Sequence, residues 1–285
     1  MTRTGTGGQA GRRVEAGDRL VDRYRLVDML GAGDMGVVWL AADELLGRTV
    51  AVKRVGPDAH EPAGTERARR QILREGRIAA MLDHPRLLRI LDVVTDAGEP
   101  WLVLEHVEAA RSWASLLQQY GPIPPAEAAR IAAQVADALV ALHGAGVVHG
   151  DVTAENILVD ADGNVRLADF GVSRLLSDSP ETGSSAMTGF RAVRAPEVAI
   201  GVAPGTAADI FALGAVVYEA VIGVPVVGSG EDDSGRRFPV PPPLRAGALA
   251  RVLAELARVE PARRPDAETA RSMFADLVEA NRIRP

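Results

Sequence analysis

The apolar residues change their spacing once along the chain, and this change constrains the fold more than any other feature. Before residue 107 the pattern predicts one amphipathic helix at 65–82 among strands at 24–55, 87–94 and 101–107. After residue 107 it predicts mainly helices, at 126–142, 209–223 and 245–280. Strands first and helices later indicate an α+β fold with two segregated lobes.

Composition excludes several classes of protein. The 285 residues carry a net charge of −6, which gives no broad basic surface for nucleic acid. Cysteine is absent, so disulfides and thiolate metal sites are excluded and a reducing cytosol is favoured. No apolar run approaches the roughly 20 residues of a membrane span, and residues 1–20 predict a flexible tail rather than a secretory signal. We therefore expect a cytoplasmic protein without a membrane segment.

Lysine usage points to one special position. Of the 32 basic residues, Lys53 is the only lysine, and it follows the apolar run Val50-Ala51-Val52. A lysine ammonium is a compact point charge, whereas arginine is a broad planar fork, so a tight phosphate site distinguishes the two. We expect Lys53 to contact phosphate.

A glycine-rich segment precedes this lysine. Gly31, Gly33 and Gly36 form the pattern G-x-G-x-x-G-x-V, which lets a backbone approach phosphates closely. A dinucleotide-binding turn shares the spacing, but it would run from a strand into a helix. Here the pattern predicts a strand on both sides, which favours a nucleotide-phosphate loop. Asp34 at the tip is unusual, because its carboxylate would lie near anionic phosphates unless it points to solvent.

The most specific pattern lies in the second half of the chain. The sequence His149-Gly150-Asp151-Val152-Thr153-Ala154-Glu155-Asn156 is followed by Asp169-Phe170-Gly171, 18 residues after Asp151, and then by Ala195-Pro196-Glu197. Phosphoryl transfer needs an acceptor for the hydroxyl proton and hard oxygen ligands for Mg²⁺. Asp151 fits the base, and Asn156 and Asp169 fit the metal ligands. We expect ATP and Mg²⁺ to be bound.

A glutamate on the predicted helix 65–82 should hold Lys53 in place. Glu75 is the candidate, because it lies near the apolar stripe of that helix; Glu66 is the competitor.

These motifs together resemble the bacterial relatives of eukaryotic-type serine/threonine protein kinases. The resemblance covers about residues 24–277 and implies a small β-rich N-lobe at 21–106 and a larger helical C-lobe at 107–285. It implies that the adenine lies between Leu30, Val38, Ala51 and Leu158, with Leu104 as gatekeeper and backbone groups of Glu105 and Val107 bonded to the base. It further implies that Asp209 anchors the catalytic loop and that Glu197 pairs with Arg264 to brace the large lobe. A stacked apolar spine would be formed by Ala79, Ile90, His149 and Phe170.

The chain departs from the family pattern on the acceptor side. The family's arginine before the catalytic aspartate is Gly150, so activation through a phosphate bound at that arginine should be absent. The family's lysine two residues after the aspartate is Thr153, and its threonine and tyrosine before Ala195 are Phe190 and Val193. Loss of one charge-assisted contact to the transferring group costs about 10²–10³ in rate.

Three functions remain open on the sequence. The first is transfer of the γ-phosphoryl group of ATP to a protein serine or threonine. The second is a pseudokinase that binds ATP and a regulatory partner, and the third is a small-molecule phosphotransferase, since His-Gly-Asp with a later Asn also occurs in such enzymes. Because no sensor segment is expected, regulation would come from a partner or another chain. The sequence leaves the substrate and the oligomeric state open.

Overall fold

The computed structural model describes residues 14–33, 36–54, 80–170, 194–223 and 247–282. Several predicted residues lie outside these ranges, among them Asp34, Glu66, Glu75, Ala79, Phe190 and Val193. The described residues fall into two compact units. The first contains the chain up to Met81 together with Arg89–His106, and the second contains Leu82–Leu88 and the chain from Val107 onward, apart from a short undescribed stretch.

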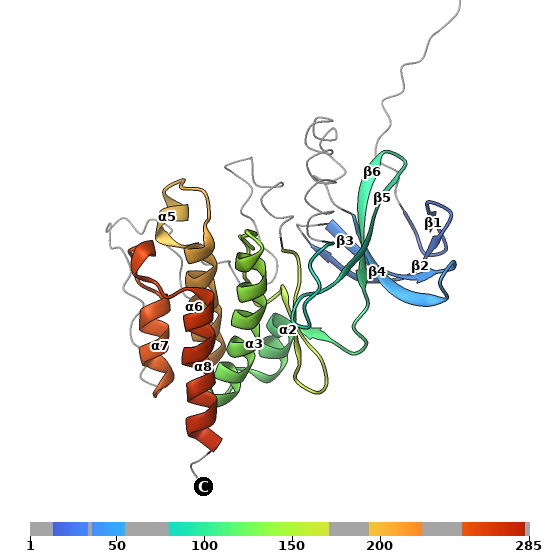
Figure 1. Ribbon diagram of the computed structural model, residues 1–285. Helices are drawn as coiled ribbons and strands as arrows, with labels where there is room; N and C mark the ends of the chain where they lie inside the picture. The colour runs from blue at the N-terminus through green and yellow to red at the C-terminus, as the bar shows by residue number, and fades with distance from the viewer. Residues whose placement is uncertain (1–13, 34–35, 55–79, 171–193, 224–246, 283–285) are drawn as a thin grey trace, which may run out of the picture. The chain divides into compact units, whose positions relative to one another are not determined.

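The first unit is built on one antiparallel sheet with the strand order β1-β2-β3-β4-β6-β5 (Figure 1). Its strands are β1 (Arg19–Leu20), β2 (Tyr24–Gly33), β3 (Gly36–Asp43), β4 (Arg48–Arg54), β5 (Ile90–Asp96) and β6 (Glu99–Glu105). Alternate residues of these strands pack into a core that includes Leu26, Trp39, Val52, Trp101 and Val103. Because side chains alternate across a strand, the same strands leave a second face for other contacts.

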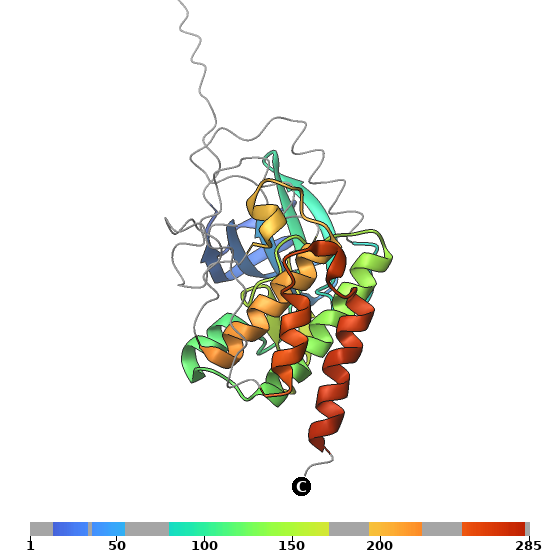
Figure 2. The ribbon, with the colours of Figure 1, turned by 90° about the vertical axis from the view of Figure 1, so that its left-hand side faces the viewer.

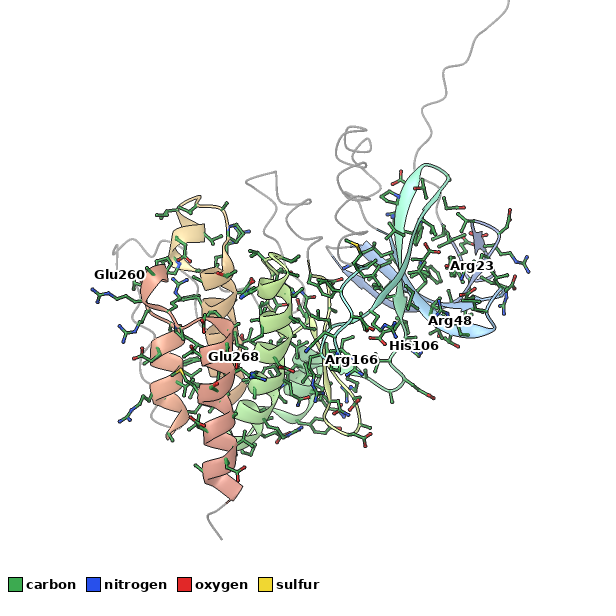
Figure 3. All side chains as sticks on the ribbon, in the orientation of Figure 1. Arg23, Arg48, His106, Arg166, Glu260 and Glu268 are labelled. Carbon is green, nitrogen blue, oxygen red and sulfur yellow. The ribbon has the colours of Figure 1, made fainter. Side chains whose placement is uncertain are left out.

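A buried carboxylate at the end of β3 joins two arginines of this unit. The side chain of Asp43 is fully buried and binds Arg23 through two hydrogen bonds of 2.8 Å and Arg48 at 3.2 Å. Figure 3 labels these two arginines, which come from different parts of the chain. The hydrogen bonds from Arg23 lower the pKa of Asp43 to about 2, so the carboxylate stays charged at neutral pH.

The second unit is mainly helical. Its elements are β7 (Arg111–Ser112), α2 (Trp113–Tyr120), α3 (Pro125–Gly144), β8 (Ile157–Val159), β9 (Val165–Leu167), α5 (Pro196–Ala199), α6 (Thr206–Ile222), α7 (Leu249–Leu256), a short 3₁₀ helix η1 (Pro261–Arg263) and α8 (Ala267–Arg282). Helices α3 and α8 lie side by side, and α6 packs against α3 (Figures 1 and 2). In the part of the chain that is described, none of the helices combines the length and the apolarity needed to span a bilayer.

Most predicted elements of the second unit are present. The helix predicted at 126–142 is α3, which starts at Pro125 as a proline at the first helical position favours. The helix predicted at 209–223 is α6, and a tight turn that contains Asp162 and Gly163 joins β8 to β9. The fold is therefore α+β, as predicted, with the strands of the first unit preceding the helices of the second.

Candidate functional site

The glycine-rich segment lies between two paired strands. Gly31 pairs with Val38, and Gly33 pairs with Gly36, so the loop is closed by β2 and β3. A dinucleotide-binding turn would lead into a helix instead. The structure thus confirms the predicted strand on both sides of the loop.

The register of the sheet places four predicted nucleotide-binding residues on one face. Val38 lies opposite Lys53, and Ala51 lies opposite Leu104. Lys53 and Ala51 are two residues apart in β4, so their side chains point to the same side. Only 8% of Lys53 is exposed. This face therefore combines an ammonium group with small and branched apolar side chains, which suits a phosphate and an aromatic base.

Two residues at and beyond the end of β6 were predicted to bond the base through their backbone groups. The N–H of Glu105 donates to the carbonyl of Arg89 at 2.9 Å, and the Glu105 carboxylate accepts from the Arg89 N–H at 3.0 Å. In the second unit, the carbonyl of Val107 accepts from Ala110 N–H at 3.2 Å. The contacts of Glu105 and Val107 with the adenine base stay predictions.

A buried aspartate anchors the loop that carries Asp151. Asp209 lies in the first turn of α6, where the partial positive charge of the helix terminus favours a carboxylate. It accepts the backbone N–H groups of His149 at 2.9 Å and of Gly150 at 2.8 Å. Its carboxylate also lies 2.8 Å from His143 Nε2. The loop backbone is thus fixed to α6 at two consecutive residues.

Gly150 adopts a left-handed backbone conformation with φ +79°. A residue with a Cβ enters this region only at a cost, whereas glycine does so freely. Glycine at this position is therefore compatible with the backbone that Asp209 holds.

The ring of His149 joins the catalytic loop to the hairpin that follows it. His149 Nδ1 accepts the N–H of Asp151 at 3.2 Å, and Nε2 lies 2.9 Å from the carbonyl of Ala168. Because Nδ1 accepts, the proton sits on Nε2, which donates to Ala168. This buried neutral imidazole fixes the backbone of Asp151 relative to the residue before Asp169.

Asn156 is bound to Asp151 by its amide group. Asn156 Nδ2 donates to the Asp151 carbonyl and to Asp151 Oδ2, each at 2.9 Å. The two bonds orient the amide, so that Oδ1 of Asn156 is turned away from the aspartate.

Asp169 and Phe170 follow β9. Asp169 has φ +62°, a conformation that aspartate tolerates better than most residues but that still requires support from its surroundings. Phe170 is 2% exposed and supplies an apolar anchor directly after it. The Ala168 N–H donates to the Asn156 carbonyl at 2.8 Å, so Asn156 and Asp169 lie at the same end of one hairpin.

These two residues fit magnesium. An amide oxygen and a carboxylate are the hard ligands that Mg²⁺ accepts, and Mg²⁺ is commonly bound through one or two protein groups together with phosphate oxygens. The orientation of Asn156 by Asp151 leaves its oxygen, rather than its NH₂, available for the cation.

The chain matches the protein kinase domain family over residues 24–270. It belongs to the protein kinase family. This confirms the resemblance drawn from the motifs, and the bacterial serine/threonine kinases among its relatives place it with the eukaryotic-type kinases of bacteria.

Three relatives illustrate the similarity. The serine/threonine-protein kinase PknB of Mycobacterium leprae is 34% identical over 279 residues, 93% of this chain and 44% of the relative. The probable serine/threonine-protein kinase PknB of Corynebacterium glutamicum is 38% identical over 213 residues, covering 72% and 32%. The serine/threonine-protein kinase PrkC of Bacillus subtilis is 34% identical over 211 residues, covering 73% and 31%. The chain therefore spans less than half the length of these relatives.

The kinase domain contains the ion pair expected between Glu197 and Arg264. Arg264 Nη1 and Nη2 lie 2.6 and 2.8 Å from the two Glu197 oxygens, and the Arg264 side chain is fully buried. The same guanidinium donates to the carbonyls of Ala207, Arg258 and Val259. The pair thus ties α5 to α6 and to the start of the C-terminal helices.

Two polar residues near the catalytic loop were missed by the sequence analysis. His143, in the last turn of α3, contacts Asp209. Glu219 of α6 is 7% exposed, and its Oε1 has no hydrogen-bond partner among the residues that the structure describes. Burial, together with the charge of Glu155, raises the pKa of Glu219 to about 7. A glutamate inside the apolar run 209–223 was the available signal for Glu219.

The predicted site residues of the kinase domain divide between the two units. Leu30, Val38, Ala51, Lys53, Leu104 and Glu105 belong to the first, and Val107, Asp151, Asn156, Leu158 and Asp169 belong to the second. Their convergence on one nucleotide remains a prediction, as does the pairing of Lys53 with Glu75.

Proposed function

We propose that this chain is the catalytic domain of a serine/threonine protein kinase, which transfers the γ-phosphoryl group of Mg·ATP to a protein hydroxyl. The observation that carries the proposal is the network around Asp151. His149 and Asn156 both bind Asp151, and Asp209 fixes the backbone before it. A carboxylate held in this way is prepared to orient a hydroxyl group and to accept its proton.

In the proposed reaction the serine or threonine oxygen attacks the γ-phosphorus atom. The bond from that phosphorus to the oxygen bridging it to the β-phosphate breaks, ADP leaves with the bond electrons, and the hydroxyl proton passes to Asp151. Lys53 would bind the α- and β-phosphates, and Asn156 and Asp169 would hold the cation. When bound, Mg²⁺ neutralises negative charge on the phosphates.

The acceptor side supports a slower reaction than the family norm. Thr153 replaces a cation, and its Oγ1 is a distant acceptor for the Asn156 N–H at 3.4 Å. A hydroxyl cannot supply the positive charge of an ammonium to the transferring group. Relative to family members that carry a lysine in place of Thr153, we therefore expect a larger loss in the rate of phosphoryl transfer than in the affinity for ATP.

The same substitution favours a second candidate, a pseudokinase that binds Mg·ATP and presents a surface to a regulatory protein. Gly150 and Thr153 leave the loop without the two cations that the family places beside Asp151. In both candidates the partner is a protein. ATP is a cytoplasmic substrate, so we also propose that the domain acts in the cytoplasm.

One assay separates these candidates. The purified chain is incubated with γ-labelled ATP, Mg²⁺ and a generic protein substrate, beside its Asp151→Asn variant. A kinase gives label on serine or threonine that the variant loses. Thermal stabilisation by Mg·ATP without label above the variant's background would instead establish the pseudokinase, and label on a co-purified metabolite would favour a small-molecule phosphotransferase.

A further inference from the structure

We propose that Gln134 and Arg130 of α3 are positioning residues for the hairpin that carries the two metal ligands. The inference rests on the proposed function, because it concerns how Asn156 and Asp169 are held for Mg·ATP. Neither side chain hydrogen-bonds to Asn156 or Asp169. Both act through the β8–β9 hairpin.

The hairpin sets the spacing of the two ligands at its open end. Asn156 directly precedes β8, and Asp169 follows β9 by two residues. Ile157 pairs with Leu167 in the ladder, and the Ala168 N–H donates to the Asn156 carbonyl. A tilt of one strand relative to its neighbours therefore moves both ligands.

The turn at the other end of the hairpin is closed by hydrogen bonds to one side chain. The Asp160 carboxylate accepts the N–H groups of Asp162 at 3.0 Å and of Asn164 at 2.8 Å. Gly163 takes the left-handed conformation, with φ +75°. Such a turn moves as one body with the two strands.

Two side chains of α3 bind this turn. Gln134 Nε2 donates to the Gly163 carbonyl at 3.0 Å, and Gln134 Oε1 accepts the Val165 N–H at 3.1 Å. Arg130 Nη1 donates to the same Gly163 carbonyl at 2.8 Å. The two residues are four apart and so lie on one face of the helix. A Cβ on Gly163 would lie 2.5 Å from Arg130 Nη2, which shows how closely the turn is approached.

The side-chain amide of Gln134 accepts a backbone N–H of β9 that a neighbouring strand would otherwise bind. In the three-stranded sheet β7-β8-β9, strand β9 is an edge, and its outward groups need other partners. The Leu167 N–H and carbonyl bond to Arg86 and Leu88, and the Val165 N–H bonds to Gln134. Gln134 thus satisfies the outward donor of β9 nearest the turn and connects that strand to a helix packed against α8.

We call the hydrogen bonds from Gln134 and Arg130 to the turn the clamp. The strained backbone of Asp169 is the reason that loss of the clamp should weaken Mg²⁺ binding. A left-handed φ at a non-glycine residue persists only where the surrounding structure imposes it. Without Gln134 the turn end of the hairpin is held from outside by Arg130, by a 3.3 Å bond from Arg86 to Asn164 and, on the β8 side, by the pairing of Val159 with Arg111. The hairpin can then tilt about its open end, which relaxes Asp169 and moves its carboxylate away from the position that suits the cation.

The test compares Gln134→Leu with the matched control Val135→Ala, measuring ATP affinity over a range of Mg²⁺ concentrations. Val135 is the next residue of α3, is fully buried and makes no hydrogen bond to the hairpin, so its truncation destabilises the helix without releasing the clamp. We expect Gln134→Leu to raise the Mg²⁺ concentration for half-maximal enhancement of ATP binding by about 10-fold, the lower range for loss of an outer-shell partner. ATP affinity without Mg²⁺ should stay within about twofold of the wild type.

Gln134→Glu is the conservative variant. It keeps the acceptor for the Val165 N–H and places a carboxylate beside Arg130, but it loses the donor to the Gly163 carbonyl, so its Mg²⁺ requirement should lie between those of the wild type and Gln134→Leu. If Gln134→Leu does not fold, Arg130→Ala serves instead, with an expected rise of about threefold. The inference is overturned if Gln134→Leu lowers the melting temperature but leaves the Mg²⁺ concentration for half-maximal enhancement unchanged. It is also overturned if that concentration changes no more than in Val135→Ala. If the ATP affinity of the wild-type chain does not depend on Mg²⁺, the proposed function is overturned, and the inference with it.

Discussion

Replacing Glu219 by glutamine should stabilise the domain at alkaline pH and leave it nearly unchanged at acid pH. Glu219 lies in the buried helix α6, where only 7% of the residue is exposed, and within the described parts of the chain its Oε1 accepts no hydrogen bond. Burial, and then the charge of Glu155, raises the pKa of this carboxyl from 4.5 to about 7. Between pH 4.5 and about 7 the native state therefore keeps a proton on this carboxyl that the unfolded state releases.

The sign and size of the effect follow from this difference. Below pH 4.5 the carboxyl is protonated in both states and imposes no penalty. Between pH 4.5 and 7 the unfolded state ionises first, so stability falls with rising pH, and above pH 7 the whole penalty is present. At roughly 1.4 kcal/mol for each tenfold change in proton affinity, the penalty is about 3 kcal/mol. Glutamine has no charge to bury.

The assay is urea unfolding of the wild type, Glu219→Gln and the exposed control Glu127→Gln at pH 4.5, 6 and 8. We expect the advantage of Glu219→Gln to grow from near zero to about 3 kcal/mol across this range, while Glu127→Gln stays within about 0.5 kcal/mol throughout. An advantage that does not change with pH, or a loss of stability at pH 8, would refute the reasoning.

Three further outcomes are expected. Arg264→Met leaves the Glu197 carboxylate without its partner and should lower the free energy of unfolding by about 3–5 kcal/mol, measured by urea unfolding; a loss under 1 kcal/mol contradicts the role given to the pair. Asp209→Ala removes the acceptor for two loop N–H groups and should reduce kcat at least about tenfold with ATP affinity within about threefold, measured by labelling and calorimetry; equal losses in both would point to general unfolding instead. Gly150→Arg must enter a left-handed φ and should cost about 1–2 kcal/mol without raising the rate of labelling, and a faster variant of unchanged stability would show the opposite.

The long elements were predictable because their patterns are local. The helices α3 and α6 follow from apolar spacing, with the N-terminus of α3 given by Pro124-Pro125. The glycine loop was placed between strands because apolar runs flank it on both sides. The two-residue strands β1 and β7 were not predicted, since they exist only through pairing with β2 and β8.

The site was predicted as a set of roles rather than as a set of contacts. Motif spacing assigned Asp151, Asn156 and Asp169, but not the amide orientation that Asp151 gives to Asn156. The contact of His143 with Asp209 joins residues 66 apart, and no local pattern encodes it. The clamp on the hairpin by α3 was missed for the same reason, since Gln134 and Gly163 meet only in the folded unit.

The most direct test of the central claim is the ATP affinity of the purified chain by calorimetry, with and without Mg²⁺, for the wild type, Lys53→Met and Asp169→Ala. We predict tighter binding with Mg²⁺ in the wild type, loss of that enhancement in Asp169→Ala, and weaker binding under both conditions in Lys53→Met. Wild-type, Mg²⁺-enhanced affinity in both variants would show that these residues, from the two units of the domain, do not meet at one nucleotide.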